Sequence, residues 1–270
     1  MKRIASWLLA GVIGLTGAAT ATADGSSYLE MVRLQMAKAG FPPGYLATSA
    51  LPAGIALLPP PPAAGSDAER RDLEANAAAL ALSGADAARK AMAAADANTQ
   101  FPAVTQTFTC ALGLEITEAA TPTLYKLMRR TLSDFGLSTM TVKQHYQRPR
   151  PFMVNGQPSC VPGDEERLRK DGSYPSGHSA YGFGWAMVLA SVAPDHADAL
   201  LQRGLAYGTS REVCNVHWRS DVEQGRIVAA AVFARLQGEA EFRRDVEAAR
   251  AEVEAARRGA PAVALTACGK

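Results

Sequence analysis

The pattern of apolar and polar positions predicts helices along most of the chain, and no segment alternates as a half-buried strand would. The best-defined helix follows Thr121, which can cap it, and Pro122, which suits its first turn. Gly136 can end it. One apolar face recurs at helical spacing between these residues and consists of Leu124, Leu127, Met128, Leu132 and Phe135.

Other segments complete the helical pattern. Residues 67–97 consist mainly of Ala, Leu, Glu and Arg, which are strong helix formers. Residues 179–193 are apolar nearly all round, which places that helix inside a bundle, and residues 222–236 repeat this character. Residues 239–258 are charged and amphipathic and should lie on the surface. We predict an all-α fold, a single helical-bundle domain with a buried helical pair at its centre.

The N-terminus has the composition of a cleavable signal peptide. Met1-Lys2-Arg3 is a basic start, residues 4–19 are uncharged and mostly apolar, and Ala21-Thr22-Ala23 is the small-residue pattern of a cleavage site. A membrane anchor is the alternative, but the apolar stretch is short and rich in Gly, Ala and Thr, which favours cleavage. No later segment is long and apolar enough to span a bilayer. We therefore expect a periplasmic or secreted protein.

The composition also indicates how the rest of the chain is organised. Residues 24–66 are loop-rich and contain four consecutive prolines, which are compatible with neither a helix interior nor a central strand. Removing the signal peptide takes away Lys2 and Arg3, so the formal net charge falls from +2 to 0. A neutral chain without a basic run has no electrostatic footprint for nucleic acid. We predict a signal peptide (1–23), an extended N-terminal segment (24–66), one domain (67–259) and a C-terminal tail (260–270).

Four cysteines remain in the mature chain: Cys110, Cys160, Cys214 and Cys268. An even number in an exported protein favours disulfides, and the absence of a CxxC pair argues against a metal site. Four cysteines allow three pairings, and their positions alone do not choose among them.

Three short stretches concentrate the residues that carry chemistry. In the first, Lys143 and Arg150 are two helical turns apart, so a helix ending near Pro149 would point both cations roughly one way. For this stretch alone, a solvated basic face is the better interpretation. In the second, Ser176 and Gly177 precede an apolar helix and offer a hydroxyl and free backbone N–H groups to an anion, helped by the helix dipole.

Two of the four histidines fall within these stretches. His178 follows the anion cradle; a lone histidine there is more often a core residue, but beside the cradle a general acid becomes competitive. In the third stretch Arg211 precedes His217 and Asp221, which are four positions apart and would be neighbours on a helix. An aspartate that accepts from Nδ1–H leaves Nε2 free as a nucleophile, although such pairs are also common on protein surfaces.

The three stretches together supply three cations, neutral donors, an acid and a nucleophile, the combination that phosphoryl transfer requires. They resemble the three-part signature of the type 2 phosphatidic acid phosphatase (PAP2) superfamily, which includes bacterial non-specific acid phosphatases and vanadium haloperoxidases. The matching positions are Lys143, Arg150-Pro151, Pro175-Ser176-Gly177-His178, Ser210-Arg211, His217 and Asp221.

Within that superfamily the chain looks like the class A bacterial non-specific acid phosphatases. Residues 172–178 resemble the signature of that class, and the proline-rich stretch followed by Gly65-Ser66 resembles its N-terminal segment. The resemblance runs from about Leu57 to the charged last helix and departs at Ser179, where Thr is more usual.

The resemblance implies an acid phosphatase that hydrolyses phosphomonoesters with broad specificity, without a metal or other cofactor, and with phosphotransfer as a side activity. The resemblance implies that His217 attacks phosphorus, that Asp221 holds the His217 ring, and that His178 protonates the leaving group. An ordinary histidine pKa of about 6.5 for His178 would explain an acidic pH optimum. The phosphate oxygens are bound by Lys143, Arg150, Ser176, Gly177 and Arg211.

The same resemblance implies a Cys160–Cys214 disulfide, leaves Cys110–Cys268 as the second pair, and suggests inhibition by vanadate and a homodimer. Three alternatives remain. The chain length and the class A features argue against a vanadate-dependent haloperoxidase, and a membrane lipid phosphatase would need several spans. A phosphate-binding protein without turnover would need neither His178 nor His217.

Overall fold

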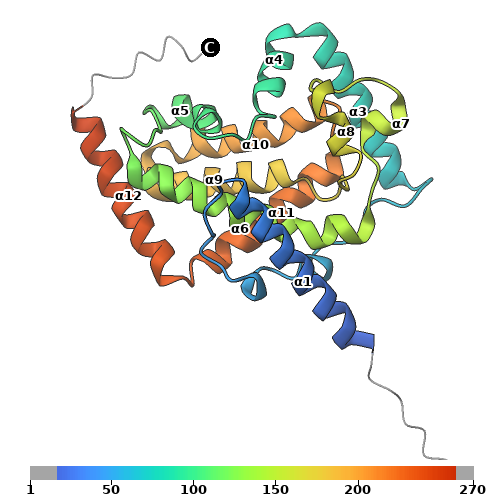
Figure 1. Cartoon of the computed structure of the whole chain (residues 1–270). Helices are drawn as coiled ribbons and strands as arrows, with labels where there is room; N and C mark the ends of the chain where they lie inside the picture. Colours follow the sequence, from blue (N-terminus) through green and yellow to red (C-terminus); the bar gives the residue numbers. More distant parts are fainter. Residues whose placement is uncertain (1–16, 260–270) are drawn as a thin grey trace, which may run out of the picture.

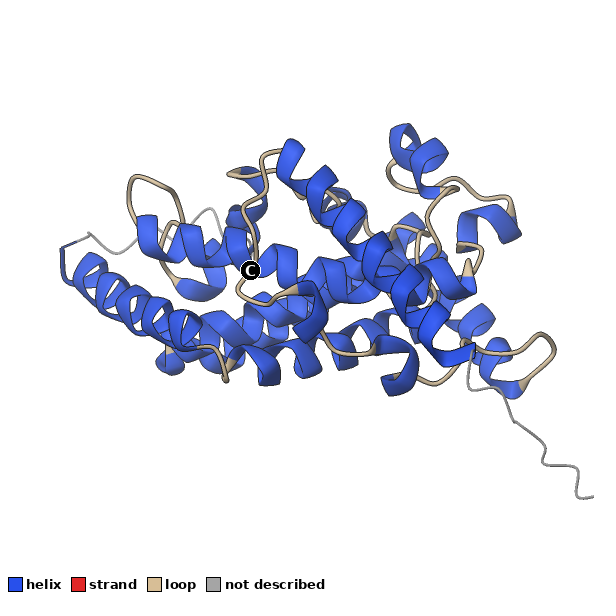
Figure 2. Ribbon diagram, turned by 60° about the horizontal axis from the view of Figure 1, so that its bottom comes forward, coloured by secondary structure: helices blue, strands red, loops and turns tan. Residues whose placement is uncertain are grey.

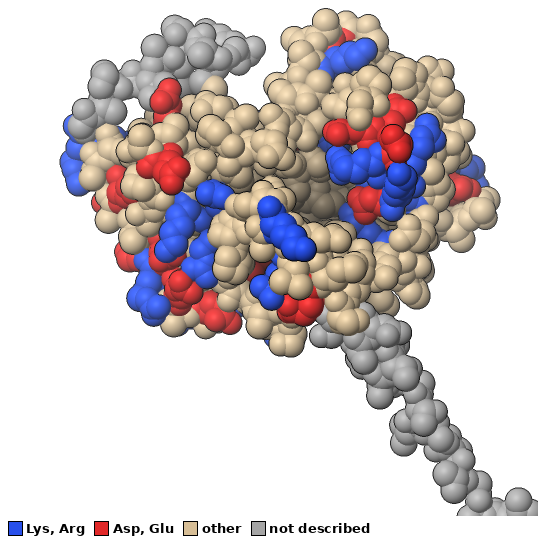
Figure 3. All heavy atoms as spheres, in the orientation of Figure 1, with Lys and Arg blue, Asp and Glu red and all other residues tan. Residues whose placement is uncertain are grey.

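The computed structural model describes residues 17–259, and in this range the fold is all-α without a strand (Figures 1 and 2). One face of the molecule is hollowed near its middle (Figure 3). The longer helices are α1 (Gly17–Lys38), α3 (Asp67–Ala85), α4 (Ala87–Ala95), α5 (Gln106–Leu112), α6 (Pro122–Tyr146), α9 (Gly177–Val192), α10 (Ala197–Val213), α11 (Arg219–Leu236) and α12 (Ala240–Gly259). Connections contain α2 (Gly54–Leu57), α7 (Pro151–Asn155), α8 (Glu165–Leu168) and the 3-10 turns η1 (Thr48–Ala50), η2 (Ala103–Thr105), η3 (Pro162–Asp164) and η4 (Pro194–His196).

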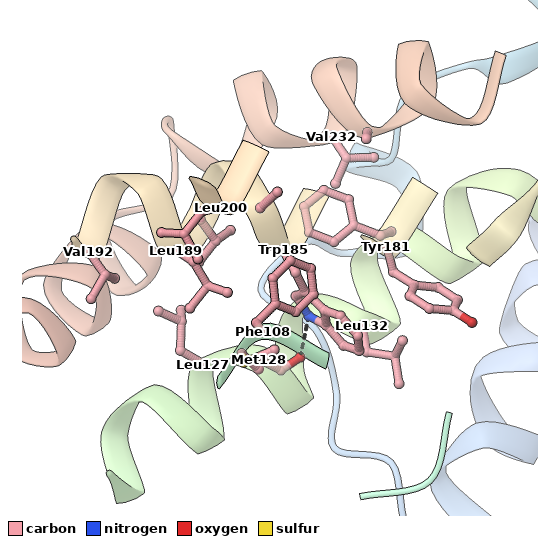
Figure 4. Close-up of a cluster of buried hydrophobic side chains, with 14 of the residues drawn as sticks. Phe108, Leu127, Met128, Leu132, Tyr181, Trp185, Leu189, Val192, Leu200 and Val232 are labelled. Atoms are coloured by element: carbon pink, nitrogen blue, oxygen red, sulfur yellow. Dashed lines mark hydrogen bonds between the residues drawn. The ribbon is translucent and has the colours of Figure 1, made fainter. Parts of the chain in front are cut away.

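Helix α9 is the centre of the bundle, as its apolar circumference predicts. It packs against α6, α10, α11 and α12, so side chains on every side of it are buried. Trp185 is fully buried, and its indole Nε1–H donates to the Met128 carbonyl of α6 at 3.0 Å (Figure 4). This bond satisfies the polar edge of a large core side chain and connects the two helices.

Helix α6 is longer than predicted. It passes through Gly136 and ends at Tyr146, so the assignment of Gly136 as a stop is wrong. Its apolar face continues beyond the glycine with Leu137 and Val142, and burying that face outweighs the roughly 1 kcal/mol that glycine costs a helix.

The start of α6 is where the sequence predicts it, but Thr121 makes no side-chain cap. The Glu252 carboxylate of α12 accepts from the backbone N–H groups of Thr123 and Leu124, both at 2.9 Å. A residue far along the chain therefore satisfies the donors at this helix end.

The other predicted helices are present with adjusted limits. Residues 67–97 form two helices, because Asp86 leaves the helical conformation and its carboxylate caps α4 by accepting from the Arg89 N–H at 2.8 Å. Residues 179–193, 222–236 and 239–258 correspond to α9, α11 and α12. Helix α10, with a mixed sequence, was not predicted.

The N-terminal segment differs most from expectation. Helix α1 continues to Lys38, so the loop-rich stretch is confined to residues 39–66 and does not begin at residue 24. The basic start of the predicted signal peptide and most of its apolar stretch lie outside the described residues, as does the predicted tail from residue 260. None of the helices between residues 17 and 259 combines the length and hydropathy needed to cross a membrane.

Candidate active site

A cavity of about 520 Å³ brings most of the predicted site residues together. It lies beside the N-terminal end of α9, and Figure 3 shows the hollowed face, with Lys, Arg, Asp and Glu side chains grouped on one side. A larger cavity of about 750 Å³ lies between the proline stretch, α3 and α11 and reaches neither His178 nor His217. The predicted residues that line the smaller cavity are Lys143, Arg150, Gly177, His178, Arg211 and His217.

Lys143 and Arg150 meet at this cavity by a different route from the one predicted. Lys143 lies in the last turn of α6, but Arg150 is outside that helix and precedes α7 in extended conformation. The chain leaves α6 at Gln147, whose φ of 43° is left-handed, and then runs through Pro149 to Arg150. Lys143 and Arg150 therefore line the same cavity because the chain changes direction after α6, and not because they lie two turns apart within one helix.

A carboxylate joins these two cations. Asp171 Oδ2 is 3.3 Å from Lys143 Nζ and 2.9 Å from an Arg150 terminal nitrogen. Lys143 also donates to the Gly172 carbonyl. A Cβ on Gly172 would lie 2.6 Å from the Lys143 carbonyl oxygen, so only glycine permits this close approach. Burial lowers the pKa of Lys143 to about 8 and that of Arg150 to about 10.

Of the three cations that line the cavity, Arg211 is the one for which no hydrogen-bond partner is found among the described residues. It is 2% exposed, and its Nε and one terminal nitrogen find no hydrogen-bond acceptor within the described part of the chain. A buried guanidinium with free donors is costly, and an anion in the cavity would relieve that cost. Lys143 and Arg150 have Asp171, so Arg211 is the strongest single indication of an anion site.

The predicted cradle starts α9 as expected. Ser176 is the N-cap residue, and its hydroxyl oxygen accepts from the Ser179 N–H at 3.2 Å and from the Ser179 hydroxyl at 2.9 Å. The first helical residue, Gly177, lines the cavity, whereas Ser176 is fully buried behind it. The helix N-terminus therefore faces the three cations, which favours negative charge between them.

His217 precedes α11, whereas Asp221 lies in the first turn of that helix. The prediction that the two residues share a helix is therefore wrong. His217 Nδ1 is nevertheless 3.4 Å from Asp221 Oδ2 and 3.3 Å from the Ser173 hydroxyl oxygen, while Nε2 is 3.0 Å from an Arg150 N–H donor. Oxygen acceptors on one side and a cationic donor on the other favour the Nδ1–H tautomer. The lone pair of Nε2 is then directed toward the cations of the cavity.

Asp221 is fully buried and held from several directions. It accepts from the backbone N–H of Trp218 at 2.9 Å, from the Ser173 hydroxyl, and from Arg148 at 2.7 Å. Arg148 bonds Asp72 of α3 at 2.8 Å through its other terminal nitrogen. The result is a buried chain of ion pairs, Asp72–Arg148–Asp221, behind the His217 ring.

His178 has different surroundings. Its Nε2 is 3.2 Å from the Ala97 carbonyl oxygen, which can only accept, so Nε2 carries a proton and Nδ1 is the atom that can exchange one with a substrate. Its ring centroid lies 5.0 Å from that of Tyr181 and 6.2 Å from that of Tyr207.

The pKa expected for His178 from the sequence needs correction. Burial, and then the charge of Arg211, lower the pKa of His178 well below its ordinary value. Burial, and then Arg150 and Lys143, do the same to the pKa of His217. With no anion bound, burial and the neighbouring cations therefore favour the neutral form of both rings.

The loop that carries His217 is fixed on its outer side. A disulfide joins Cys160 to Cys214, as the resemblance implied, and Cys160 N–H donates to the Cys214 carbonyl at 3.1 Å. Asn215 has a left-handed φ of 59°, and its side-chain oxygen accepts from Asn76 and Asn155 at 3.0 and 2.8 Å. Cys268, the expected partner of Cys110, lies outside the described residues, so that pairing stays a prediction.

Sequence reasoning missed four residues of this site: Asp171, Ser173, Arg148 and Asp72. Arg148 and Ser173 were inside motifs already singled out, so a search for polar residues next to the predicted ones would have found them. Asp171 directly precedes the 172–178 motif and would be found in the same way, whereas Asp72 carries no local signal, because only the packing of α3 brings it to the site. Between residues 17 and 259, no group of three or more His, Cys, Asp or Glu side chains could hold a metal ion.

Comparison with known proteins agrees with this geometry. The sequence model of the PAP2 superfamily matches residues 131–237. An acid phosphatase of Zymomonas mobilis subsp. mobilis is 42% identical over 206 residues, 76% of this chain and 77% of that protein. A non-specific acid phosphatase of Providencia stuartii is 38% identical (77% of this chain, 84% of that protein), and one of Salmonella typhimurium is 39% identical (73% and 78%). The chain therefore belongs to the PAP2 superfamily, in the family of the bacterial non-specific acid phosphatases.

Proposed function

We propose that this protein is an acid phosphatase that hydrolyses phosphate monoesters with broad specificity through a phosphohistidine formed on His217. The observation that carries the proposal is the buried Arg211 guanidinium with unpartnered donors, in the same cavity as His217, whose Nε2 faces the cations. The acid phosphatases to which the chain is similar support the same reaction class.

Binding begins with the phosphate group of the substrate. Lys143, Arg150 and Arg211 bind its non-bridging oxygens, helped by the N–H of Gly177 and by the Ser176 hydroxyl behind it. The dianion competes with Asp171 for Lys143 and Arg150, and it provides the acceptor that Arg211 lacks. Charge that spreads over the phosphoryl oxygens in the transition state is then stabilised by three cations whose side chains are largely buried.

His217 is the nucleophile. As Nε2 forms a bond to phosphorus, the bond from phosphorus to the ester oxygen breaks and its electron pair stays on that oxygen. The positive charge that develops on the ring is stabilised at Nδ1–H by Asp221 and Ser173. Because Asp221 is itself held by Arg148 and a backbone N–H, the ring keeps its orientation through the reaction.

His178 is the general acid and then the general base. It gives a proton to the leaving oxygen, and in the second step it takes a proton from water as that water attacks phosphorus and releases inorganic phosphate from Nε2. Since burial and Arg211 lower the pKa of His178 in the free site, protonation has to accompany anion binding. The two negative charges of the phosphate next to the ring raise its pKa again. Proton uptake coupled to substrate binding is a physical basis for an acidic pH optimum.

The positive charge that the reaction needs comes from the chain itself, so we propose catalysis without a metal or other cofactor, phosphotransfer to alcohols as a side activity, and inhibition by vanadate. The Cys160–Cys214 disulfide supports an extracytoplasmic location, which we propose to be periplasmic or secreted after cleavage of residues 1–23. A homodimer is part of the same proposal.

The test is hydrolysis of p-nitrophenyl phosphate at pH 5–6 by the purified mature protein, with and without EDTA and with vanadate. We expect turnover that survives EDTA and is blocked by vanadate. Loss of activity with EDTA would contradict the metal-free mechanism. Absence of turnover together with peroxidase activity on added vanadate would favour a haloperoxidase, and phosphate binding without either activity would favour a binding protein.

A further inference from the structure

One wall of the active-site cavity is formed by helix α1, which lies outside the residues matched by the superfamily. Tyr28, Val32, Gln35 and Met36 line the cavity together with His178 and His217. Spacings of four, seven and eight residues put these side chains on one face of the helix. Tyr28, Val32 and Met36 are only half-buried, so this face covers the cavity without being packed into the core.

The position of α1 is fixed by contacts around it. It packs along α6, and Thr48 donates to Glu30 of α1 at 2.7 Å. The segment directly after it is bound to α6 as well, because Ser133 donates to the Pro42 carbonyl at 2.7 Å and Asp134 accepts from the backbone N–H groups of Tyr45 and Leu46 at 3.0 and 2.9 Å. All of these residues follow the predicted cleavage site, so the wall stays in the mature chain.

The chemistry of the two sides of the cavity differs. The cations Lys143, Arg150 and Arg211 gather at one side, where the phosphate is bound. Val32 and Met36 of α1 are joined by Met140 of α6 and Tyr181 of α9, which gives the cavity an apolar part, although Arg167 and Lys170 also line it. Gly136 lies on the α6 side, and a Cβ there would meet nothing within 4 Å, which leaves room for a bulky group between α6 and α1.

The position of His178 indicates in which direction the alcohol part of a substrate extends. His178 lines this cavity and also a second one of about 520 Å³ that includes Phe41 and Asn98. Since the acid must reach the ester oxygen, the alcohol part of a substrate begins beside His178 and extends away from Lys143, Arg150 and Arg211, toward Met36 and Phe41; Arg167 lines both cavities.

We infer that the inner face of α1 is the wall against which the leaving group packs, and that Val32 and Met36 select phosphomonoesters whose alcohol part is aromatic or otherwise apolar. This rests on the proposed phosphatase function. Neither side chain touches the reacting atoms, so both determine specificity and not the chemical step. Each side chain contributes apolar contact with the leaving group. Because this contact is equally strong in the bound substrate and in the transition state, its loss should raise KM and leave kcat unchanged.

The experiment compares phenyl phosphate with glycerol 2-phosphate as substrates for the full mature protein and for Val32→Ala, Met36→Ala and the double variant. We expect the double variant to lose about fivefold to tenfold in kcat/KM for phenyl phosphate, mainly through a higher KM, because two apolar contacts are lost. For glycerol 2-phosphate the change should stay below about twofold, and competitive inhibition by inorganic phosphate should not change.

Matched controls come from the outer face of the same helix, where Met31 and Leu34 are 47% and 53% exposed. Met31→Ala and Leu34→Ala should leave the ratio between the two substrates unchanged, and thermal unfolding of every variant checks that α1 is still docked. Equal losses for both substrates, or the same effect in the controls, would overturn the inference alone. A wild-type protein that hydrolyses neither substrate would overturn the proposed function and this inference with it.

Discussion

The two histidines of the cavity lie in contrasting surroundings. Behind His217 the structure is polar and closely connected: Asp221 and Ser173 face one ring nitrogen, and the Arg148–Asp72 ion pair lies behind Asp221. His178 instead has one carbonyl acceptor and the rings of two tyrosines. Burial lowers the pKa of both rings, so burial alone does not distinguish them.

The two roles proposed for these histidines require different surroundings. A nucleophile must present the same nitrogen with the same tautomer in every cycle, and a carboxylate network enforces this. An acid that becomes a base must change its protonation state twice per cycle, and a permanent carboxylate partner would hold its proton. The absence of a carboxylate contact to His178 among the described residues is therefore consistent with its proposed role.

Replacing His217 should have the largest effect. His217→Ala removes the atom to which phosphorus is transferred, so we expect kcat to fall by about 10⁴-fold or more. Inorganic phosphate should still bind, because Lys143, Arg150 and Arg211 remain, and isothermal titration measures this. Substantial turnover by the variant would mean that His217 is not the nucleophile.

Replacing His178 should produce a loss that depends on the leaving group. His178→Ala removes the acid, which costs about 10²–10⁴-fold in kcat for an alkyl phosphate whose alkoxide needs a proton. With p-nitrophenyl phosphate the loss in the first step should be much smaller, since nitrophenolate leaves unprotonated. Single-turnover release of nitrophenol separates that step from hydrolysis of the phosphohistidine. The same loss for both substrates in this step would argue against an acid role.

Weakening the network behind His217 should have an intermediate effect. Arg148→Lys keeps the charge but cannot bond Asp72 and Asp221 at once, so we expect kcat to fall about tenfold with little change in KM. The control is Arg219→Lys, whose ion pair with Glu212 at 3.2 Å lies away from the ring. If both variants had the same kinetics, the ion-pair chain would have no part in positioning His217.

The lowered pKa values predict how stability depends on pH. Below about pH 6.5 both histidines of the unfolded chain become protonated, whereas burial and nearby cations oppose their protonation in the folded, anion-free protein, so stability should fall as pH drops from 6.5 to 5. Each histidine contributes a slope of about 1.4 kcal/mol per pH unit once pH is below its unfolded pKa. Asp134 acts in the opposite direction, because burial raises its pKa to about 6.

Comparing wild type with His178→Gln isolates the contribution of His178 to the pH dependence of stability, because Asp134 is present in both proteins. Urea unfolding at pH 7, 6 and 5 should show a gentler decline for the variant. Saturating phosphate should flatten the decline of the wild type, since it favours the protonated ring. Parallel curves for the two proteins would show that His178 titrates normally in the folded state.

The smallest effect should come from a substitution that leaves both histidines untouched. Gly136 is in the middle of α6, and an added Cβ would meet nothing within 4 Å, so Gly136→Ala should stabilise the protein by about 0.5–1 kcal/mol. Thermal unfolding measures the change, and Gly172→Ala, whose Cβ would lie 2.6 Å from a carbonyl oxygen, is the contrasting variant that should destabilise it.

The sequence alone was enough to predict the fold class, three of the central and C-terminal helices, and the six residues that line the cavity, because these depend on local periodicity and on short motifs. It also supplied the identity of the Cys160–Cys214 pair through resemblance. It failed at α1, at the length of α6, where burial of Leu137 and Val142 outweighs local propensity, and at the capping of α6, where the distant Glu252 accepts from the helix N–H groups.

The surroundings of each motif residue depend on the packing of distant segments and could not be predicted from the sequence. Arg148 contacts Asp221 and Asp72 across 73 and 76 positions of sequence, and α1 reaches the cavity from the other end of the chain. Such contacts leave no periodic trace, since each depends on how whole helices pack and not on spacing within one of them. The pKa values follow the same logic: the type of residue sets the ordinary value, but burial and neighbouring charge, which exist only in the folded protein, set the actual one.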